Sequence, residues 1–255
     1  MAPRTRARVL EDLKRRREVA WKRCTWRRFF DLLRQAAALR DPEALFELGT
    51  FYRDGLCDRR GRAILRPSAV VSARLFRRAA ELGDTDGMDA LASYLSEPWM
   101  SASGRPPRSR SRLVEAFRWY HQALARGRLE TASNLAVNYQ NLGHHRQAVH
   151  WFRRAAAAGD ESALFDLAKA ELYGLGCRRN VTAALEKLRR VGDERNSGVS
   201  PFEAECAMVL MGKLLMEGWL VKRDYRAGLY WLRRAAAWGS AAAAGLLNDL
   251  NEPET

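Results

Sequence analysis

One nine-residue phrase recurs along this 255-residue chain and restricts what the chain can fold into. Residues 151–159 read WFRRAAAAG and residues 231–239 read WLRRAAAWG, while 75–83 and 119–127 are weaker copies. In each copy the aromatic and alanine residues stand at helical spacing, and the closing glycine suits a left-handed helix C-cap. Self-similarity at a period of a few tens of residues is typical of a solenoid of stacked repeats.

A second kind of helix opens at a small residue. Four such openings, at Gly87, Thr131, Ala163 and Ala243, come four residues after a closing glycine, while Ala44 opens the first helix of this kind and Ala207 a later one. The openings fall at residues 44, 87, 131, 163 and 207, with spacings of 43, 44, 32 and 44 residues. Each opening is followed by a large side chain and then a glycine or alanine, as in Ala44, Leu48 and Gly49. The glycine or alanine leaves a flat spot on the helix surface. We therefore predict helix pairs in which this flat spot lets the partner helix approach closely.

These helix pairs resemble the Sel-one-like repeat (SLR), a relative of the tetratricopeptide repeat. The resemblance is carried by A-x-x-x-L-G-x-x-Y-x-x-G followed by W-x-x-x-A-A-x-x-G, and the third unit resembles a tetratricopeptide repeat. The predicted repeat-core residues are Leu48, Gly49, Tyr52, Leu135, Tyr139, Trp151, Leu167, Gly212, Trp231 and Ala235. The resemblance implies an all-α, right-handed superhelical solenoid of antiparallel helix pairs.

The resemblance covers about five repeats over residues 41–250, with a cap helix that starts at Ala243 and a tail at 251–255. Residues 1–40 are expected to form basic helices that make up a degenerate cap repeat. A Pro/Ser/Arg-rich loop is expected at 96–112. Extra residues around 58–68 and a Gly/Asn/Ser-rich stretch before Pro201 interrupt the regular spacing.

Positive charge is concentrated at the N-terminus. The formal net charge is +14, and residues 1–40 hold thirteen Lys/Arg against four Asp/Glu. The basic patch comprises Lys14, Arg15, Arg16, Arg17, Lys22, Arg23, Arg27 and Arg28. Such a run suits an acidic protein, nucleic acid or anionic lipid. The alternative is a charged capping helix that keeps the stack soluble.

By resemblance to tetratricopeptide stacks, the opening helices line a concave face. The predicted partner-binding residues on that face are Glu43, Phe46, Thr50, Arg53, Glu130, Ser133, Val137, Gln140, Phe165, Lys169, Lys213 and Met216. An exposed pair of Phe46 and Phe165 could anchor a peptide or helix. The alternative is that both rings pack against neighbouring helices.

Arginine pairs recur at one position of the repeated phrase, as in Arg153-Arg154 and Arg233-Arg234. Stacked repeats would align these pairs as a ladder on the outer face, which could attract phosphates or an acidic protein. The favoured interpretation is a solvated face whose charges pair locally, because the repeat body is close to neutral.

Nothing in the sequence indicates catalysis. There is no phosphate loop, nucleophile elbow, paired-carboxylate arrangement or metal motif, and His144, His145 and His150 lack the spacing of a metal site. We therefore expect no enzyme activity, metal, cofactor or small-molecule substrate. Four cysteines without close pairing indicate reduced thiols and a cytoplasmic protein, and Cys57, Cys177 and Cys206 are interpreted as packing thiols. No apolar run is long enough to span a membrane.

The sequence therefore predicts a non-enzymatic adaptor that holds a partner protein, expected to be acidic, on the concave repeat surface. The SLR resemblance adds that such proteins often serve in bacterial regulation, host interaction or toxin neutralisation. The alternative function is a nucleic-acid-associated factor that uses the basic N-terminus and the basic loop.

Overall fold

The computed structural model describes residues 3–58, 60–96, 110–193 and 199–250. The chain divides into two compact units, residues 1–128 (unit 1) and 129–255 (unit 2). Unit 1 contains α1 (Pro3–Lys22), α2 (Trp26–Ala38), α3 (Pro42–Asp54), β1 (Leu56–Cys57), β2 (Ala63–Leu65), α4 (Ala69–Glu81), α5 (Thr85–Ser96) and α6 (Arg110–Ala125). Unit 2 contains α7 (Thr131–Asn141), α8 (His145–Ala157), α9 (Ser162–Tyr173), α10 (Val181–Val191), α11 (Pro201–Glu217), α12 (Tyr225–Ala237) and α13 (Ala241–Asp249).

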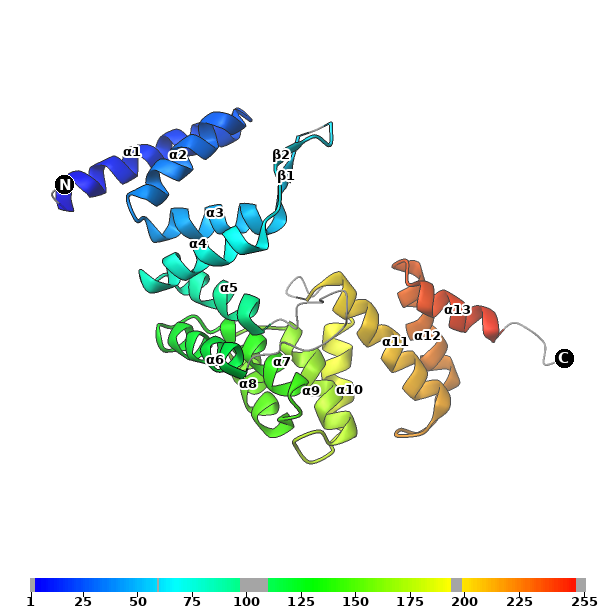
Figure 1. Cartoon of the computed structure of the whole chain (residues 1–255). Coiled ribbons are helices and arrows are strands. Elements are labelled where there is room, and N and C mark those ends of the chain that lie inside the picture. Colours follow the sequence, from blue (N-terminus) through cyan, green and yellow to red (C-terminus); the bar gives the residue numbers. More distant parts are fainter. Residues whose placement is uncertain (1–2, 59, 97–109, 194–198, 251–255) are drawn as a thin grey trace. The chain divides into compact units, whose positions relative to one another are not determined.

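Successive helices pack as antiparallel pairs (Figure 1). The pairs of unit 1 are α1–α2, α3–α4 and α5–α6. Those of unit 2 are α7–α8, α9–α10 and α11–α12, and α13 packs on α12. The predicted all-α solenoid of helix pairs is therefore confirmed.

A glycine turn ends one helix and prepares the next. Gly159 follows α8 with a φ of +96°, and the Asp160 amide donates to the carbonyl of Ala155 at 3.0 Å. The Asp160 carboxylate then accepts from the Ser162 amide at 3.0 Å, at the start of α9. Gly239 has a φ of +95° in the corresponding turn before α13. The left-handed C-cap predicted from the repeated phrase is confirmed.

The flat spots of the opening helices lie directly against their partner helices. A Cβ atom on Gly49 of α3 would lie 2.7 Å from the Phe76 ring of α4. One on Gly212 of α11 would lie 2.6 Å from Cγ of Leu232 on α12. Side chains do not approach this closely, so a larger residue at either position would push the helix pair apart.

Aromatic rings join the first three helices of unit 1. The ring of Trp21 lies 5.1 Å from that of Trp26 and 5.3 Å from that of Phe29, measured between centroids. Phe51 of α3 lies 5.5 Å from Phe29 and 5.2 Å from Phe30. Each such ring pair contributes about 0.5–1.5 kcal/mol beyond the burial of its area. The rings thus tie α1 and α2 to the first repeat.

A β-hairpin occupies the insertion expected around residues 58–68. Strands β1 and β2 are antiparallel, with Leu56 opposite Leu65 and Cys57 opposite Ala63 (Figure 1). The sequence analysis predicted extra residues here but no strands. Leu56 and Leu65 pack on the core of unit 1, so the hairpin is attached to the first repeat by its apolar side chains.

The break in the fourth repeat falls where the sequence predicts it. Helix α10 ends at Val191, and α11 begins with Pro201 at its first position. Ser200 and Glu203 form a capping box at that start. Residues 97–109 of the expected 96–112 loop, and the tail 251–255, lie outside the described residues.

Candidate partner-binding surfaces

Two of the predicted groove residues of unit 1 form ion pairs with other residues of the protein. Glu43 of α3 accepts a hydrogen bond from Lys14 of α1 at 2.9 Å. Arg53, at the other end of α3, pairs with the adjacent Asp54 at 2.8 Å. Both side chains are more than half exposed, so these ion pairs are weak and leave part of each group accessible.

The two predicted phenylalanine anchors are half-buried rather than exposed. Phe46 lies 5.8 Å from the ring of Phe76, and Thr50 donates a hydrogen bond to the Phe46 carbonyl at 3.2 Å. Phe165 packs on the core of unit 2 beneath the ammonium group of Lys169, which lies 4.5 Å from its ring centre. Both rings therefore pack against their neighbours, as the alternative interpretation held.

The groove positions of α7 differ in exposure. Glu130 and Val137 are exposed, and Val137 retains 39% of its accessible surface. Gln140 is half-buried, and Ser133 donates a hydrogen bond to Asp160. Val137 and Glu130 are thus the groove positions of α7 most open to a partner.

The two predicted groove residues of α11 line a pocket of about 420 Å³. Lys213 and Met216 form one wall, Tyr225 contributes from α12, and Leu246 and Leu250 contribute from α13. Helix α11 has 17 residues, whereas α13 has nine. The pocket lies between the last turns of α11 and the C-terminal end of α13.

Part of the predicted basic patch faces into unit 1. Outside the patch, Arg6 of the same helix donates from Nε to the carbonyl of Leu39 at 3.0 Å. Arg17 is not a surface residue, because its side chain is 9% exposed and pairs with Glu47 of α3 at 3.0 Å. Burial raises the pKa of Glu47, and the hydrogen bond to Glu43 raises that of Lys14. These cations fasten α1 to its neighbours.

The rest of the basic patch is exposed, namely Lys14, Arg15, Arg16, Lys22, Arg23, Arg27 and Arg28. Arg16 pairs with Asp12, and Lys22 pairs with Glu18. Within the described residues, the side chains of Arg15, Arg23, Arg27 and Arg28 have no hydrogen-bond or ion-pair partner. The last three of these stand together around the turn between α1 and α2.

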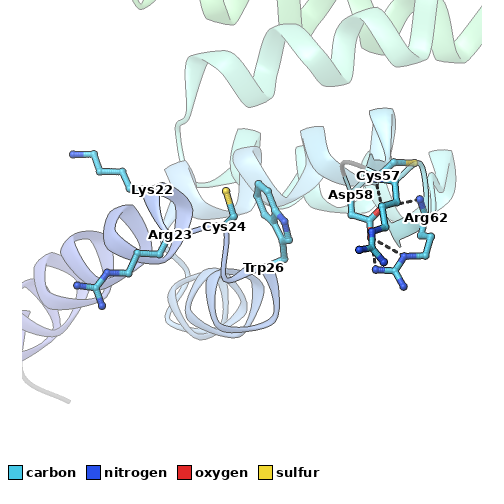
Figure 2. Close-up of a pocket in the computed structure, with 8 residues that line it drawn as sticks. Lys22, Arg23, Cys24, Trp26, Cys57, Asp58 and Arg62 are labelled. Carbon is cyan, nitrogen blue, oxygen red and sulfur yellow. Dashed lines mark hydrogen bonds and ion pairs between the residues drawn. The ribbon is translucent and has the colours of Figure 1, made fainter.

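A pocket of about 580 Å³ lies beside this turn (Figure 2). One wall is formed by residues 22–26, with Trp26 at its edge, and the other by the hairpin residues Asp58, Arg60 and Arg62. Asp58 accepts hydrogen bonds from the Arg60 and Arg62 amides at 2.8 and 2.9 Å, and the Arg62 amide holds the pKa of Asp58 below its ordinary value. The carboxylate therefore shapes the hairpin turn.

One arginine of each pair in the repeated phrase is held locally. The guanidinium carbon of Arg154 lies 4.8 Å from the ring centre of Trp151, and that of Arg234 lies 4.9 Å from Trp231. Arg190 forms an ion pair with a glutamate just before α9. Each cation covers a ring or neutralises a carboxylate of its own unit, which agrees with the solvated-face interpretation.

The structure places the ten predicted repeat-core residues in two groups. The buried residues are Leu48, Gly49, Leu135, Leu167, Gly212 and Ala235, and the half-buried residues are Tyr52, Tyr139, Trp151 and Trp231. All four half-buried residues are aromatic. The two tryptophans keep one part of the ring at the surface, where the arginine side chains lie against it.

The cysteines are free thiols in two environments. Cys177 and Cys206 are half-buried, and burial raises the pKa of both. Cys24 and Cys57 are exposed, so the interpretation of Cys57 as a packing thiol is wrong. Among the residues that the structure describes, no three or more His, Cys, Asp or Glu gather in a metal-binding group. No helix of that part of the chain is long and apolar enough to cross a membrane.

The Sel1 repeat family matches residues 42–84, 103–127, 145–160, 161–186 and 207–240, more than half of the chain. The chain therefore belongs to the Sel1 (Sel-one-like) repeat family. It is similar to a protective antigen of uropathogenic Escherichia coli that displays an SLR fold, with 25% identity and a TM-score of 0.65 over 87% of this chain and 44% of that one. A Sel1 repeat protein from Oxalobacter formigenes shares 15% identity, with a TM-score of 0.64 over 94% of this chain and 89% of that one.

The chain spans less than half the length of the Escherichia coli antigen. None of the curated proteins matches it. Proteins of the Sel1 repeat family generally mediate protein–protein interactions, and their fold is typically a non-enzymatic scaffold.

Two features of these surfaces escaped the sequence analysis. The hairpin wall of Arg60 and Arg62 was not connected with the N-terminal basic patch, because the two segments are far apart in sequence. The burial of Arg17 depends on Glu47, which lies in another helix. The sequence did offer one signal for the hairpin wall. The insertion around residues 58–68 is rich in arginine, and the family pattern does not require it.

Proposed function

We propose that this protein is a non-enzymatic adaptor that holds a segment of a partner protein on the surface of its opening helices. The observation that carries the proposal is the pocket between α11 and α13. Lys213 and Met216, which the resemblance to tetratricopeptide stacks predicts on the concave face, both line it.

The composition of this pocket suits an apolar side chain of a partner. Met216, Tyr225, Leu246 and Leu250 supply apolar surface, and the charged groups that line it include Lys213. Protein interfaces commonly combine an apolar centre with a polar rim, and a few buried anchors supply most of the affinity. Methionine adapts its shape to different partners. The α11–α13 pocket therefore fits an aliphatic or aromatic anchor residue.

The partner is proposed to be an acidic protein of the cytoplasm. The net charge of +14 favours association with acidic surfaces, and four free thiols suit a reducing compartment. Roles in bacterial regulation, host interaction or toxin neutralisation are all compatible with such an adaptor, and the similar Escherichia coli antigen belongs to a uropathogen.

The test is isolation of the tagged protein from its own cells at physiological salt, with and without nuclease. Leu250→Glu places a charge at the pocket, and Leu142→Glu is its control, because both leucines are exposed residues that cap a helix C-terminus. We expect one acidic protein to co-purify in near-stoichiometric amount, to survive nuclease, and to be lost with Leu250→Glu alone. A complex that disappears with nuclease would instead favour a nucleic-acid-associated function.

A further inference from the structure

We infer that the pocket between the α1–α2 turn and the β1–β2 hairpin binds an acidic protein segment carrying an apolar side chain. This inference rests on the proposed adaptor function and assigns a second contact site to it. The site lies within unit 1, and none of its lining residues belongs to the repeat-core or groove positions predicted from the family pattern.

The charge around this pocket is positive, and two of its four cations have no partner among the described residues. Its lining holds four cationic residues, Lys22, Arg23, Arg60 and Arg62, and one carboxylate, that of Asp58. Asp58 is occupied by Arg62, whose terminal guanidinium nitrogen lies 2.8 Å away. The side chains of Arg23 and Arg60 have no partner among the described residues.

Two more cations follow the pocket residue Trp26 in the sequence. Arg27 and Arg28 are exposed in the first turn of α2, which contains no acidic residue. The helix dipole disfavours positive charge at this end, so these arginines do not serve the stability of α2. The carboxylates nearest to these arginines in the sequence already form ion pairs with other residues. Glu18 pairs with Lys22 at 2.7 Å, and Asp31 pairs with Arg34 at 3.4 Å.

The pocket also offers apolar surface between its charged walls. Trp26 is half-buried and lies edge-on to Trp21, whose ring is 44% exposed. Cys24 and Cys57 contribute a thiol from each side. In Figure 2, Lys22 and Arg23 extend outward from the end of α1, and Trp26 lies between them and the hairpin residues Asp58 and Arg62.

This arrangement favours a protein segment over a nucleic acid. An apolar centre ringed by cations is the organisation of a protein interface, in which an anchor side chain fills the middle and charges pair at the rim. A surface for single-stranded nucleic acid also pairs cations with aromatic rings, but its cations line a groove that follows the phosphate backbone over several nucleotides. Here the cations stand on the two walls of one pocket, Lys22 and Arg23 on one and Arg60 and Arg62 on the other. The volume of about 580 Å³ has room for an aromatic side chain flanked by acidic residues.

The experiment measures binding of a fluorescent peptide in which phenylalanine alternates with glutamates, by anisotropy at physiological salt. Arg27→Glu/Arg28→Glu reverses charge where the helix dipole favours carboxylates, so α2 stays folded. The control is Arg178→Glu/Arg179→Glu, which changes net charge equally at exposed residues between α9 and α10. We expect affinity to fall about tenfold or more in the first variant and less than about twofold in the control, because salt screens distant charges.

A second variant and a competitor complete the test. Arg60→Glu, on the hairpin wall, should weaken the peptide as well. Equal losses in both charge-reversal variants, or no binding by the parent protein, would overturn the inference. So would an oligonucleotide of equal charge that binds more tightly than the peptide. If the native partner stays bound to Arg27→Glu/Arg28→Glu but is lost with Leu250→Glu, the adaptor function stands and this site does not.

Discussion

The helix pairs α1–α2 and α11–α12 are held in place by different physical means. In α11–α12, glycines let the two backbones approach: a Cβ on Gly228 would lie 3.0 Å from the Gly212 carbonyl oxygen. Helix α1 is fastened by large aromatic rings and by long charged side chains, with Trp21 packed on Phe29 of α2 and Arg17 reaching Glu47 of α3. The first kind of contact recurs with the repeat, whereas the second depends on one particular partner. The repeat pattern therefore describes the packing of α11–α12 far better than the packing of α1–α2.

The largest expected effect tests the apolar side of this comparison. Leu232 is 1% exposed and fills the space above Gly212. Leu232→Ala should lower the free energy of unfolding by about 2–5 kcal/mol, because the cavity is enclosed. Chemical denaturation of unit 2 or of the whole chain measures this loss. A loss below about 1 kcal/mol would mean that the pair can collapse around the gap.

A smaller loss is expected when a methyl group is added to the same pair. Gly228→Ala introduces a carbon close to the Gly212 oxygen and 3.2 Å from the Met216 amide nitrogen. We expect a net loss of about 1–3 kcal/mol, although alanine favours the helix by up to about 1 kcal/mol. Gly245→Ala is the control, since nothing lies within 4 Å of its position. A gain in both variants would show that the close approach is not required.

The charged side of the comparison is tested by Arg17→Ala. This change leaves Glu47 partly buried without its cation, which should cost about 1–2 kcal/mol. Arg15→Ala is the control, because Arg15 is two residues away on the exposed side of the same helix. Denaturation curves should show a loss for Arg17→Ala alone. Equal stability of the two variants would show that the Arg17–Glu47 ion pair does not stabilise the fold.

The same variant should make stability depend on pH. Burial raises the pKa of Glu47 above its ordinary value of 4.5 in the folded state. The cost of the buried carboxylate is therefore fully present at neutral pH and is relieved as the pH falls through the folded-state pKa. Because loss of Arg17 raises this pKa further, Arg17→Ala should be less destabilising at about pH 5 than at neutral pH. An unchanged difference between the two pH values would contradict this.

The smallest expected effect concerns the first turn of α2. Arg27→Glu/Arg28→Glu replaces cations that the helix dipole disfavours with carboxylates that it favours. Stability should rise by about 0.3–1 kcal/mol for each charge at low salt, and the gain should shrink as salt is added. Thermal melting at two salt concentrations measures it. A clear loss would show that these arginines support the fold.

Much of the repeat architecture could be predicted from the sequence. Gly159, Gly212 and the small residues that open each helix act through local geometry, which a residue pattern records directly. The resemblance to tetratricopeptide stacks predicted one shared face for Lys213 and Met216, but it did not predict the pocket that they line.

The remaining features depend on contacts between distant segments. The two short strands of the hairpin make no periodic pattern, and their pairing joins Leu56 to Leu65 through an insertion outside the repeat. The burial of Arg17 and the packing of Phe46 follow from residues in other helices, Glu47 and Phe76. Composition marked residues 1–40 as basic, but it could not separate the cations that hold α1 from those that face solvent.

The most direct test of the adaptor account is photo-cross-linking from the α11–α13 pocket in the native cell. A photoreactive amino acid at Lys213, which is exposed and lines the pocket, reports what occupies it. The same group at Arg233, exposed on α12, is the control. The account predicts one discrete protein adduct from position 213 that is absent from position 233. No adduct from position 213, or the same adducts from both positions, would contradict a partner segment bound in this pocket.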